Sequence, residues 1–474
     1  MKILLINANW ALDKYRYTMS VLNPYKITPL ELCYIAGGID SKNKVEIYDA
    51  YALEASWINI EQKIKTSKPD VCVITTAPTY LFWRCCPLEL SIPKKLINII
   101  KKISNARTIL IGPHGSITPR YVLDETDTDI LIKGESDLVV PKIINQNFKS
   151  IKDIPGVCIK EHISNQLAIV ENLDSLPIPR LDLLNLNLYE PHIWVKKIKD
   201  KVQHEGGLFI LAEASRGCPK RCVFCQREFF RKAYREKSAK KMEKEIDYYK
   251  KLGVKYIYFI DETGSIFTDD KKQWLEYLGH QNIKFGVEAI IDQTTTDVID
   301  RFEKAGCIYL EYGLETVDKD LHKMMAKNIA IQNLDYAKSI IDTVVCFELN
   351  FYSYDYINLL GIKDVKQEAL FNRPIIPYPG SPLGRMLLSK YKVDEKNTWD
   401  FVLRYTWWLQ VEYFFIENEI KKKGFKKEIF FKPYKPGIKE IILNSPIDKA
   451  QDLVYAILDL STFWEKNSPG FRDK

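Results

Sequence analysis

The chain alternates short apolar β-rich runs with helical runs, and this alternation restricts the possible folds more than any other feature. Over residues 1–150, five runs have the composition of strands buried on both faces. Such strands favour a doubly wound parallel sheet with helices on both sides. The predicted strands are Ile3–Ile6, Val45–Tyr48, Val71–Thr75, Thr108–Ile111 and Ile130–Ile132, and the predicted helices are Leu30–Ile39, Ile58–Lys65, Ile92–Ile103 and Leu138–Ile144.

A second series of β/α units follows a less regular stretch, and its six candidate strands suit a partial or full β/α barrel. In a barrel of this kind the chemistry takes place at the C-terminal ends of the strands. Beyond about Gly384 the pattern becomes helical and aromatic, as in Trp399–Phe415. The candidate strands are Leu208–Glu213, Val254–Ile260, Lys284–Ile290, Ile308–Leu314, Val344–Phe351 and Pro374–Ile376, and the candidate helices are Glu236–Leu252, Thr295–Ala305 and Asp318–Lys327.

These patterns predict an α/β protein with four consecutive parts. A Rossmann-like parallel sheet would occupy residues 1–150, a connector residues 151–205, a partial β/α barrel residues 206–385 and a helical region residues 386–474. A chain of 474 residues agrees with three domains and a connector, because a domain has roughly 150 residues.

Composition excludes several classes of protein. A hydrophobic share of 46% excludes disorder for most of the chain, and no apolar run approaches the roughly 18 residues of a membrane-spanning helix. The first ten residues favour a strand over a signal peptide, so we expect a cytoplasmic protein without a membrane partner. The net charge of +7 is small for this length, and a nucleic-acid partner is not expected.

Three of the ten cysteines lie within eight residues, directly after the first strand of the predicted barrel. Cys218, Cys222 and Cys225 have the spacing Cys-x3-Cys-x2-Cys, which allows three thiolates on one loop to bind one inorganic centre. Three thiolates on a four-iron cluster leave one iron open, as an active site requires. A Cys3His zinc site is the alternative, but His204 and His280 do not have the spacing of a zinc finger.

The cysteine spacing, with an aromatic residue before the last cysteine, resembles the motif of the radical SAM superfamily. The segments Val254–Thr263, Tyr312–Thr316 and Tyr378–Leu383 resemble later parts of the same barrel. The resemblance implies a [4Fe–4S] cluster on the three cysteines, with S-adenosyl-L-methionine (SAM) at the open iron. Ile290 stands where the family often has an arginine, so the usual partner of the SAM carboxylate is missing. The residues implied to contact SAM are Phe224, Asp261, Glu262, Thr263, Glu288 and Glu315.

The N-terminal region is similar to the cobalamin-binding domain that precedes many radical SAM barrels. The similarity lies in Ile111–Pro119, which contains Gly-Pro-His-Gly, and in Asp129–Ser136, which contains Gly-Glu. No Asp-x-His-x-x-Gly motif is present, so we expect no protein histidine below the cobalt, and we assign His114 to cofactor packing or to a turn. The residues implied to contact cobalamin are Thr75, Gly112, Pro113, His114, Gly115, Gly134 and Glu135.

Together these resemblances identify a cobalamin-dependent radical SAM enzyme. They imply that a 5′-deoxyadenosyl radical activates an unactivated carbon of a small-molecule or peptide substrate, which then receives the methyl group of methylcobalamin. A reductant protein such as flavodoxin or ferredoxin would supply electrons. Two alternatives remain: a radical ring contraction or cyclisation with the same cofactors, and a non-catalytic cobalamin or metal sensor. Tyr352 and Tyr354 are candidates for proton or radical transfer, although tyrosines at alternating strand positions are also ordinary core residues.

Overall fold

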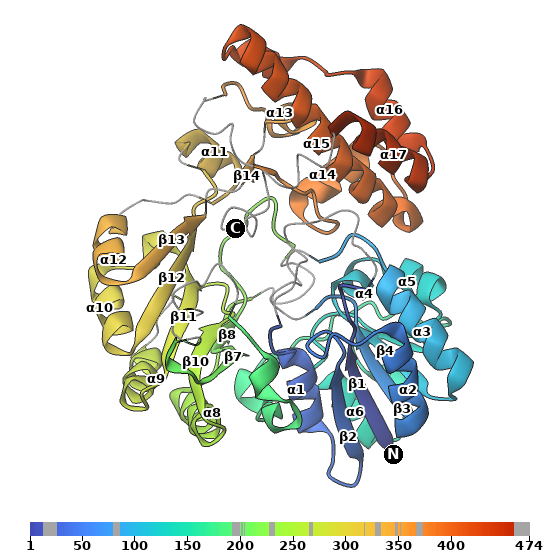
Figure 1. The fold of residues 1–474 in the computed structure, drawn as a ribbon, viewed down its shortest axis with the longest axis vertical. Helices are drawn as coiled ribbons and strands as arrows, with labels where there is room; N and C mark the ends of the chain where they lie inside the picture. The colour runs from blue at the N-terminus through green and yellow to red at the C-terminus, as the bar shows by residue number, and fades with distance from the viewer. Residues whose placement is uncertain are drawn as a thin grey trace.

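The computed structural model contains two α/β parts that lie side by side, with the C-terminal helices across one end of both (Figure 1). This arrangement confirms the predicted α/β fold with parallel sheets and a helical C-terminal region. None of the described helices is both long enough and apolar enough to cross a membrane. The structure describes residues 1–12, 26–78, 86–191, 200, 202, 204–226, 233–264, 269–316, 318–327, 333–346, 349–350, 352–365 and 373–458.

The N-terminal sheet has the strand order β2-β1-β3-β4-β5-β6, and all its neighbouring strands are parallel except β5 and β6. The order reverses between β1 and β3, and ligands of such sheets bind at the C-terminal strand ends beside this reversal. The sheet extends to residue 158, past the boundary predicted at residue 150. Its strands are β1 (Lys2–Asn7), β2 (Lys44–Asp49), β3 (Val71–Thr75), β4 (Arg107–Ile111), β5 (Ile130–Ile132) and β6 (Val157–Cys158).

Both faces of this sheet are buried, as its continuous apolar strands predict. Ile3 and Leu5 of β1 pack on one face with helices α1 and α6, whereas Leu4 and Ile6 pack on the other face with α2, α3 and α5. The segment after β4, where His114 was assigned to cofactor packing or to a turn, is the start of a short helix, because Pro113 suits a first helical position and Gly112 adopts a φ of +126°. The helices are α1 (Leu30–Gly38), α2 (Trp57–Ser67), α3 (Ser91–Ile103), α4 (Pro113–Ile117), α5 (Pro119–Thr126) and α6 (Val139–Asn145).

The second sheet is parallel and open, with the order β13-β12-β11-β10-β7, so the predicted partial barrel is confirmed. The segment predicted as a sixth strand, Pro374–Ile376, does not join this sheet: only Pro374 lies in a strand, β15 (Arg373–Pro374), which pairs with β14 (Leu349–Asn350). The strands are β7 (Leu208–Ala212), β10 (Val254–Phe259), β11 (Lys284–Ala289), β12 (Cys307–Gly313) and β13 (Asp342–Cys346), and a short antiparallel pair, β8 (Ser215–Arg216) and β9 (Arg235–Glu236), follows β7.

The two faces of this second sheet differ in character. Ile210, Ile257 and Leu310 belong to the core that includes the covering helices. Tyr258 and Tyr309 face the other way, into a core shared with the C-terminal helices. The inner face of the partial barrel is therefore aromatic and continuous with the C-terminal region. The helices of this part are α8 (Ala239–Lys251), α9 (Asp269–His280), α10 (Thr296–Lys304), α11 (Lys319–Met324) and α12 (Leu334–Ile340).

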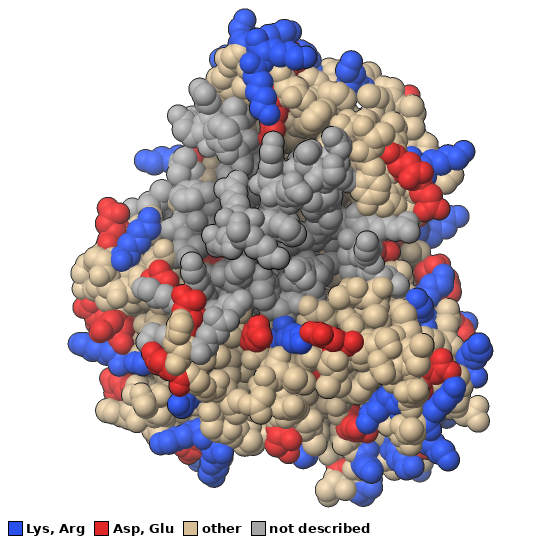
Figure 2. All heavy atoms as spheres, in the orientation of Figure 1, with Lys and Arg blue, Asp and Glu red and all other residues tan. Residues whose placement is uncertain are grey.

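The C-terminal region is organised around the 26-residue helix α15, whose tryptophans are buried in the core. The indole N–H of Trp399 donates a 2.7 Å hydrogen bond to the hydroxyl of Thr118, which joins this helix to the N-terminal part. On the face drawn in Figure 2, basic and acidic side chains are interspersed over both α/β parts. The helices are α13 (Tyr354–Leu360), α14 (Pro382–Lys390), α15 (Thr398–Lys423), α16 (Pro436–Asn444) and α17 (Ile447–Leu458).

A buried polar cluster joins α13, α14, α15 and α16. Its centre is Asp355, whose carboxylate contacts the ammonium groups of Lys390 and Lys439 at 2.6 Å and accepts hydrogen bonds from two tyrosine hydroxyls. Burial favours the neutral acid, but the nearby lysines hold the pKa of Asp355 well below its usual range. Glu412 is also buried, and burial raises its pKa to about 7. The carboxylate of Asp355 is therefore firmly ionised, and that of Glu412 is not.

Glu412→Gln should stabilise the protein at alkaline pH. The folded pKa of about 7 exceeds the ordinary value of 4.5, so the unfolded chain loses its proton first and stability falls as the pH rises through this interval. Glutamine can still accept the hydrogen bond from the Tyr354 amide, and the expected gain is on the order of 2 kcal/mol at pH 8. Thermal unfolding from pH 5 to pH 8 measures this gain, with the exposed Glu440→Gln as control. If the difference in stability between Glu412→Gln and wild type does not grow with pH, the raised pKa of Glu412 is contradicted.

Candidate functional site

The cysteine-containing loop, residues 217–226, begins directly after β8 at the C-terminal end of β7. Two carboxylates that follow β10 hold its start. Asp261 accepts hydrogen bonds from the Ala214 amide, at 3.0 Å, and from the Ser215 hydroxyl, while Glu262 accepts a 2.9 Å bond from the Gly217 amide. Gly217 adopts a φ of +89°, which favours glycine at this position. The two acids predicted to contact SAM therefore also position the cysteine loop.

The second half of the loop is held by two segments that are distant in sequence. The Val223 amide donates to the carbonyl of Met325 at 3.1 Å, and the Val223 carbonyl accepts a 2.8 Å bond from the Leu383 amide. The side-chain amide of Gln226 donates to the Pro379 carbonyl at 2.6 Å, and Gln226 is fully buried. The Pro-Gly-Ser-Pro segment singled out in the sequence thus contacts the cysteine loop directly.

The three cysteine thiols are partly exposed and lie close enough to influence one another. The pKa of Cys222 is raised to about 12, mainly by burial; Lys327 lowers it, whereas Cys225 and Cys218 act in the same direction as burial. Among the described side chains, no three histidine, cysteine or acidic groups converge closely enough to hold a single metal ion. Three thiols on one anchored loop fit an iron–sulfur cluster better than a mononuclear zinc site.

Lys327 lies beside these thiols, although the sequence did not single it out. Its ammonium group forms an ion pair with Glu315 and lies 5.8 Å from the centre of the Phe224 ring. Burial lowers the pKa of Lys327, but Glu315 and Cys222 raise it by more, and Glu288 acts in the same direction. The structure therefore brings together one cysteine and three of the predicted SAM residues around a partly buried cation.

The backbone at both ends of this ion pair is strained. Glu315 has a φ of +65° and Ala326, directly before Lys327, a φ of +53°, both in the left-handed region that residues other than glycine seldom adopt. Strain of this kind is concentrated at functional sites, where surrounding contacts maintain it. Helix α11 was expected to continue to residue 327, but it ends at Met324, and the Met325 carbonyl binds the cysteine loop instead.

A second set of polar groups lines the inner face of the partial barrel. Glu288 and Glu311 are register partners on β11 and β12. The hydroxyls of Tyr258 and Tyr309 both donate to Glu311, at 3.3 and 3.2 Å. Glu311 and the two tyrosines were missed in the sequence because their position depends on strand pairing. The remaining predicted SAM residue, Thr263, is fully buried, and its hydroxyl has no hydrogen-bond partner among the described residues.

The predicted cobalamin residues lie at the C-terminal edge of the N-terminal sheet. The Thr75 hydroxyl bonds to the Ala77 carbonyl within its own turn. A Cβ atom at Gly112 would lie 2.3 Å from the Thr76 hydroxyl oxygen, and one at Gly115 would lie 2.3 Å from a methyl carbon of Leu131. Both glycines therefore permit close approach of the backbone, and Pro113 starts the helix between them.

His114 is fully buried against the C-terminal region. Its Nε2 lies 2.8 Å from the carbonyl oxygen of Pro87, and its ring centre lies 4.2 Å from that of Trp399. Because a carbonyl only accepts, Nε2 carries the proton, and burial lowers the pKa of His114 to about 3. The ring is therefore neutral and packed between two parts of the molecule.

Three buried polar atoms at this edge have no hydrogen-bond partner within the described part of the chain. They are the hydroxyl of Thr76 after β3, Nδ1 of His114 after β4 and the hydroxyl of Ser136 after β5. Buried polar atoms are normally paired, so unpaired ones at neighbouring strand ends fit a polar ligand at this position.

Glu135, also predicted to contact cobalamin, turns toward the partial barrel. It is buried and accepts hydrogen bonds from Arg235, at 2.7 and 3.0 Å, and from the Val170 amide at 2.8 Å. Gly134 adopts a φ of +90° and pairs with Ala168. The Gly-Glu pair therefore joins two parts of the protein, a role that was not predicted.

The two candidate tyrosines have different surroundings. Tyr352 is fully buried, with its ring centre 6.0 Å from that of Phe430, which corresponds to ordinary aromatic core packing. Tyr354 is half-buried at the start of α13. Neither forms a described contact with the three cysteines, so a role in proton or radical transfer remains a prediction.

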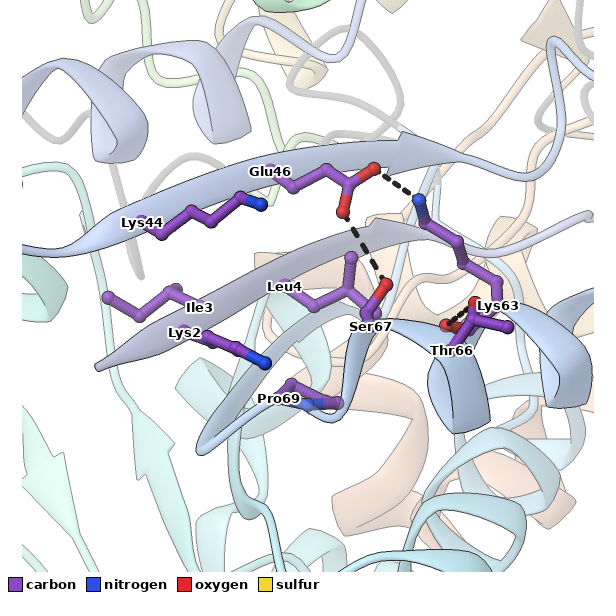
Figure 3. A pocket seen from close by; sticks show the side chains of 9 residues that line it. All are labelled: Lys2, Ile3, Leu4, Lys44, Glu46, Lys63, Thr66, Ser67 and Pro69. Carbon is purple, nitrogen blue, oxygen red and sulfur yellow. Dashed lines mark hydrogen bonds and ion pairs between the residues drawn. The ribbon is translucent and has the colours of Figure 1, made fainter.

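A hollow of about 290 Å³ lies at the opposite edge of the N-terminal sheet, beside the beginnings of β1 and β2 (Figure 3). Lys2, Lys44 and Lys63 line it, and Lys63 pairs with Glu46. Since ligands of such sheets bind at the C-terminal strand ends, this hollow does not belong to the candidate site.

Comparisons with known proteins agree with this geometry. Residues 213–350 match the family model described as the radical SAM superfamily. A Pyrococcus horikoshii protein named an uncharacterized methyltransferase is 26% identical over 326 residues, which are 66% of each chain. The anaerobic magnesium-protoporphyrin IX monomethyl ester cyclase of Cereibacter sphaeroides is 23% identical over 414 residues, which are 79% of this chain and 62% of the cyclase. The chain thus spans about two thirds of the length of these curated relatives.

Among solved structures, the fold is similar to that of OxsB, described as a cobalamin-dependent S-adenosylmethionine radical enzyme and determined with aqua-cobalamin and S-adenosylmethionine bound. The TM-score is 0.57 at 14% identity, and the match covers 97% of this chain and 75% of OxsB. Residues 213–350 therefore match the radical SAM superfamily, and the chain as a whole has a fold similar to that of OxsB.

Proposed function

We propose that this protein is a cobalamin-dependent radical SAM enzyme that methylates an unactivated carbon of a small-molecule or peptide substrate. The observation that carries the proposal is that the C-terminal edge of the N-terminal sheet lies against the cysteine loop. Glu135, after β5, contacts Arg235 of the barrel part, and the Cys86 thiol lies 3.9 Å from the side-chain oxygen of Gln226. Two cofactors bound at these positions would face one substrate space.

Each cofactor has residues that suit it. Cys218, Cys222 and Cys225 would hold the [4Fe–4S] cluster, and cobalamin would bind where Thr76, His114 and Ser136 present unpaired atoms. When bound, the cluster would provide the electron that splits SAM into a 5′-deoxyadenosyl radical, and cobalamin would provide the methyl group. The aromatic inner face of the partial barrel would exclude water from the radical. A reductant protein such as flavodoxin or ferredoxin would reduce the cluster.

His114 should not bind the lower face of the cobalt. Its protonated Nε2 donates to the Pro87 carbonyl and its ring lies against Trp399, so only Nδ1 is open to the cofactor, and we expect this nitrogen to accept a hydrogen bond instead of binding the metal. The electron paramagnetic resonance spectrum of the cobalt(II) form should therefore lack the splitting caused by an imidazole nitrogen. Detection of that splitting, and its loss in His114→Phe, would contradict this part of the proposal.

Lys327 should replace the arginine that is missing at position 290. SAM carries one carboxylate together with positive ammonium and sulfonium groups, and the site offers one cation beside the acids Glu288 and Glu315. We expect Lys327→Gln to weaken SAM binding about tenfold, because a charge-assisted bond is lost, and Lys327→Arg to retain most of the affinity. Equilibrium dialysis of SAM against the reconstituted protein measures this, with the exposed Lys319→Gln as control. Unchanged affinity in Lys327→Gln would refute the assignment.

SAM with a trideuterated methyl group distinguishes methylation from the alternative outcomes. Under reducing conditions, the proposed function places the deuterated methyl group on the extracted cobalamin, where mass spectrometry detects it. A radical rearrangement also forms 5′-deoxyadenosine but transfers no label, and a sensor does neither. The rearrangement is the second candidate, because one relative is named as a cyclase. Cleavage of SAM without label on the cobalamin would favour that second candidate.

A further inference from the structure

A network of buried charges joins the N-terminal sheet to the partial barrel. Arg216, on β8, is fully buried and contacts carboxylates from both parts. Its guanidinium group binds Asp137, after β5, at 2.8 and 3.1 Å, and binds Glu213, after β7, at 2.6 to 3.1 Å. Glu135 lies 3.4 Å from the same group and also binds Arg235. We call Glu135, Asp137, Glu213, Arg216 and Arg235 the interdomain ion network.

A third segment contacts the same network. Tyr34 lies on helix α1, which packs on the N-terminal sheet, and its ring centre is 5.8 Å from the Arg216 guanidinium. The Tyr34 hydroxyl accepts a 2.7 Å hydrogen bond from Lys237, which also binds the carbonyl of Glu213. The sheet is therefore tied to the barrel through two of its elements, α1 and the loop after β5.

The chemistry of these groups makes the contact rigid and specific. A guanidinium group offers a planar fork of donors, and two-point contact with a carboxylate fixes orientation as well as distance. Because all the charges of Arg216 and its partners are buried, a displaced partner would leave an unpaired charge away from water. A buried network of this kind permits one arrangement of the two parts and penalises others.

The position of the network in the chain indicates what it fixes. Arg216 lies two residues before Cys218, and Gly217 between them is bound by Glu262. On the other side, Glu135 and Asp137 flank Ser136, whose buried hydroxyl is one of the three unpaired atoms at the candidate cobalamin edge. One guanidinium group thus connects the start of the cysteine loop to the loop that would contact cobalamin.

We infer that the interdomain ion network sets the separation and orientation of the cluster relative to cobalamin, with Arg216 and Asp137 as positioning residues. The inference rests on the proposed function, since it requires both cofactors. A radical formed at one cofactor and a methyl group delivered from the other must meet the same carbon, and small errors of placement strongly reduce such reactions. The network supplies a fixed placement without contacting the reacting atoms.

The test measures the magnetic interaction between the reduced cluster and the cobalt(II) form of the cofactor in the full chain, by pulsed electron paramagnetic resonance. Asp137→Asn removes one interdomain charge and leaves the pair of Arg216 with Glu213 intact, so folding should be retained. Glu135→Gln is a second variant at the same contact. The control is Arg301→Gln, which removes a surface ion pair with Asp297 on α10.

In the wild-type protein and in Arg301→Gln we expect one narrow distribution of cluster-to-cobalt distances. In Asp137→Asn and Glu135→Gln we expect the distribution to broaden and shift, while the separate spectrum of each centre is unchanged. A distribution that stays as narrow as wild type in both variants would overturn the inference alone. A wild-type protein that lacks either paramagnetic centre would instead overturn the proposed function.

Discussion

Alanine in place of Cys218, Cys222 or Cys225 should abolish reductive cleavage of SAM and remove most of the iron from the protein. Each thiolate would bind one iron of the proposed cluster, and the loop offers no fourth cysteine to replace it. Cobalamin binding should be largely retained, because the candidate cobalamin residues lie at the other sheet. Iron content, cobalamin content and formation of 5′-deoxyadenosine, measured on the same preparations, separate these effects.

The matched control for the cysteine variants is Cys307→Ala. Cys307 is buried on β12 of the same partial barrel, and its thiol contacts the Tyr309 carbonyl at 3.3 Å. Its replacement removes a cysteine from the same domain without touching the cysteine loop, so iron content and SAM cleavage should stay close to wild type. SAM cleavage that survives in Cys222→Ala would refute the cluster assignment.

Gly134→Ala should destabilise the N-terminal sheet by about 3 kcal/mol, because it combines a backbone clash with backbone strain. Gly134 adopts a φ of +90°, and an added Cβ would lie 2.3 Å from the backbone oxygen of Ala168. That oxygen accepts the 2.8 Å hydrogen bond of the Glu135 amide, so the clash would displace the loop that carries the interdomain contacts. Chemical or thermal denaturation, followed by circular dichroism, measures the loss.

Gly361→Ala separates the clash from the backbone strain. Gly361 ends α13 with a φ of +67°, and no atom lies within 4 Å of a Cβ built there. It should therefore cost about 1 kcal/mol, the strain alone. Equal losses of stability in the two variants would show that the contact with Ala168 does not matter.

Strand and helix positions could be predicted from the sequence because they depend on local patterns. The continuous apolar strands β3 and β4 are buried on both faces as expected, and the candidate helix at Thr295–Ala305 corresponds closely to α10. The short helix α4 was missed because it begins in a Gly-Pro turn, and its five residues are too few to show helical periodicity.

The residues that the sequence analysis missed act through contacts between distant segments. Lys327 is close to Glu315 and Cys222 only because α11 ends early and the following carbonyl binds the cysteine loop. Arg216 stands beside the cysteine motif, but its partners lie on another sheet, so no spacing in the sequence indicates them. Glu135 was noticed for its Gly-Glu motif, and only the structure shows that its carboxylate binds Arg235.

One chain should hold both a four-iron cluster and cobalamin, and the metal content of the anaerobically reconstituted protein tests this directly. We expect about four irons and one cobalt per chain, with the iron lost and the cobalt retained in Cys222→Ala. Zinc in place of iron, or iron without cobalt after incubation with cobalamin, would contradict it.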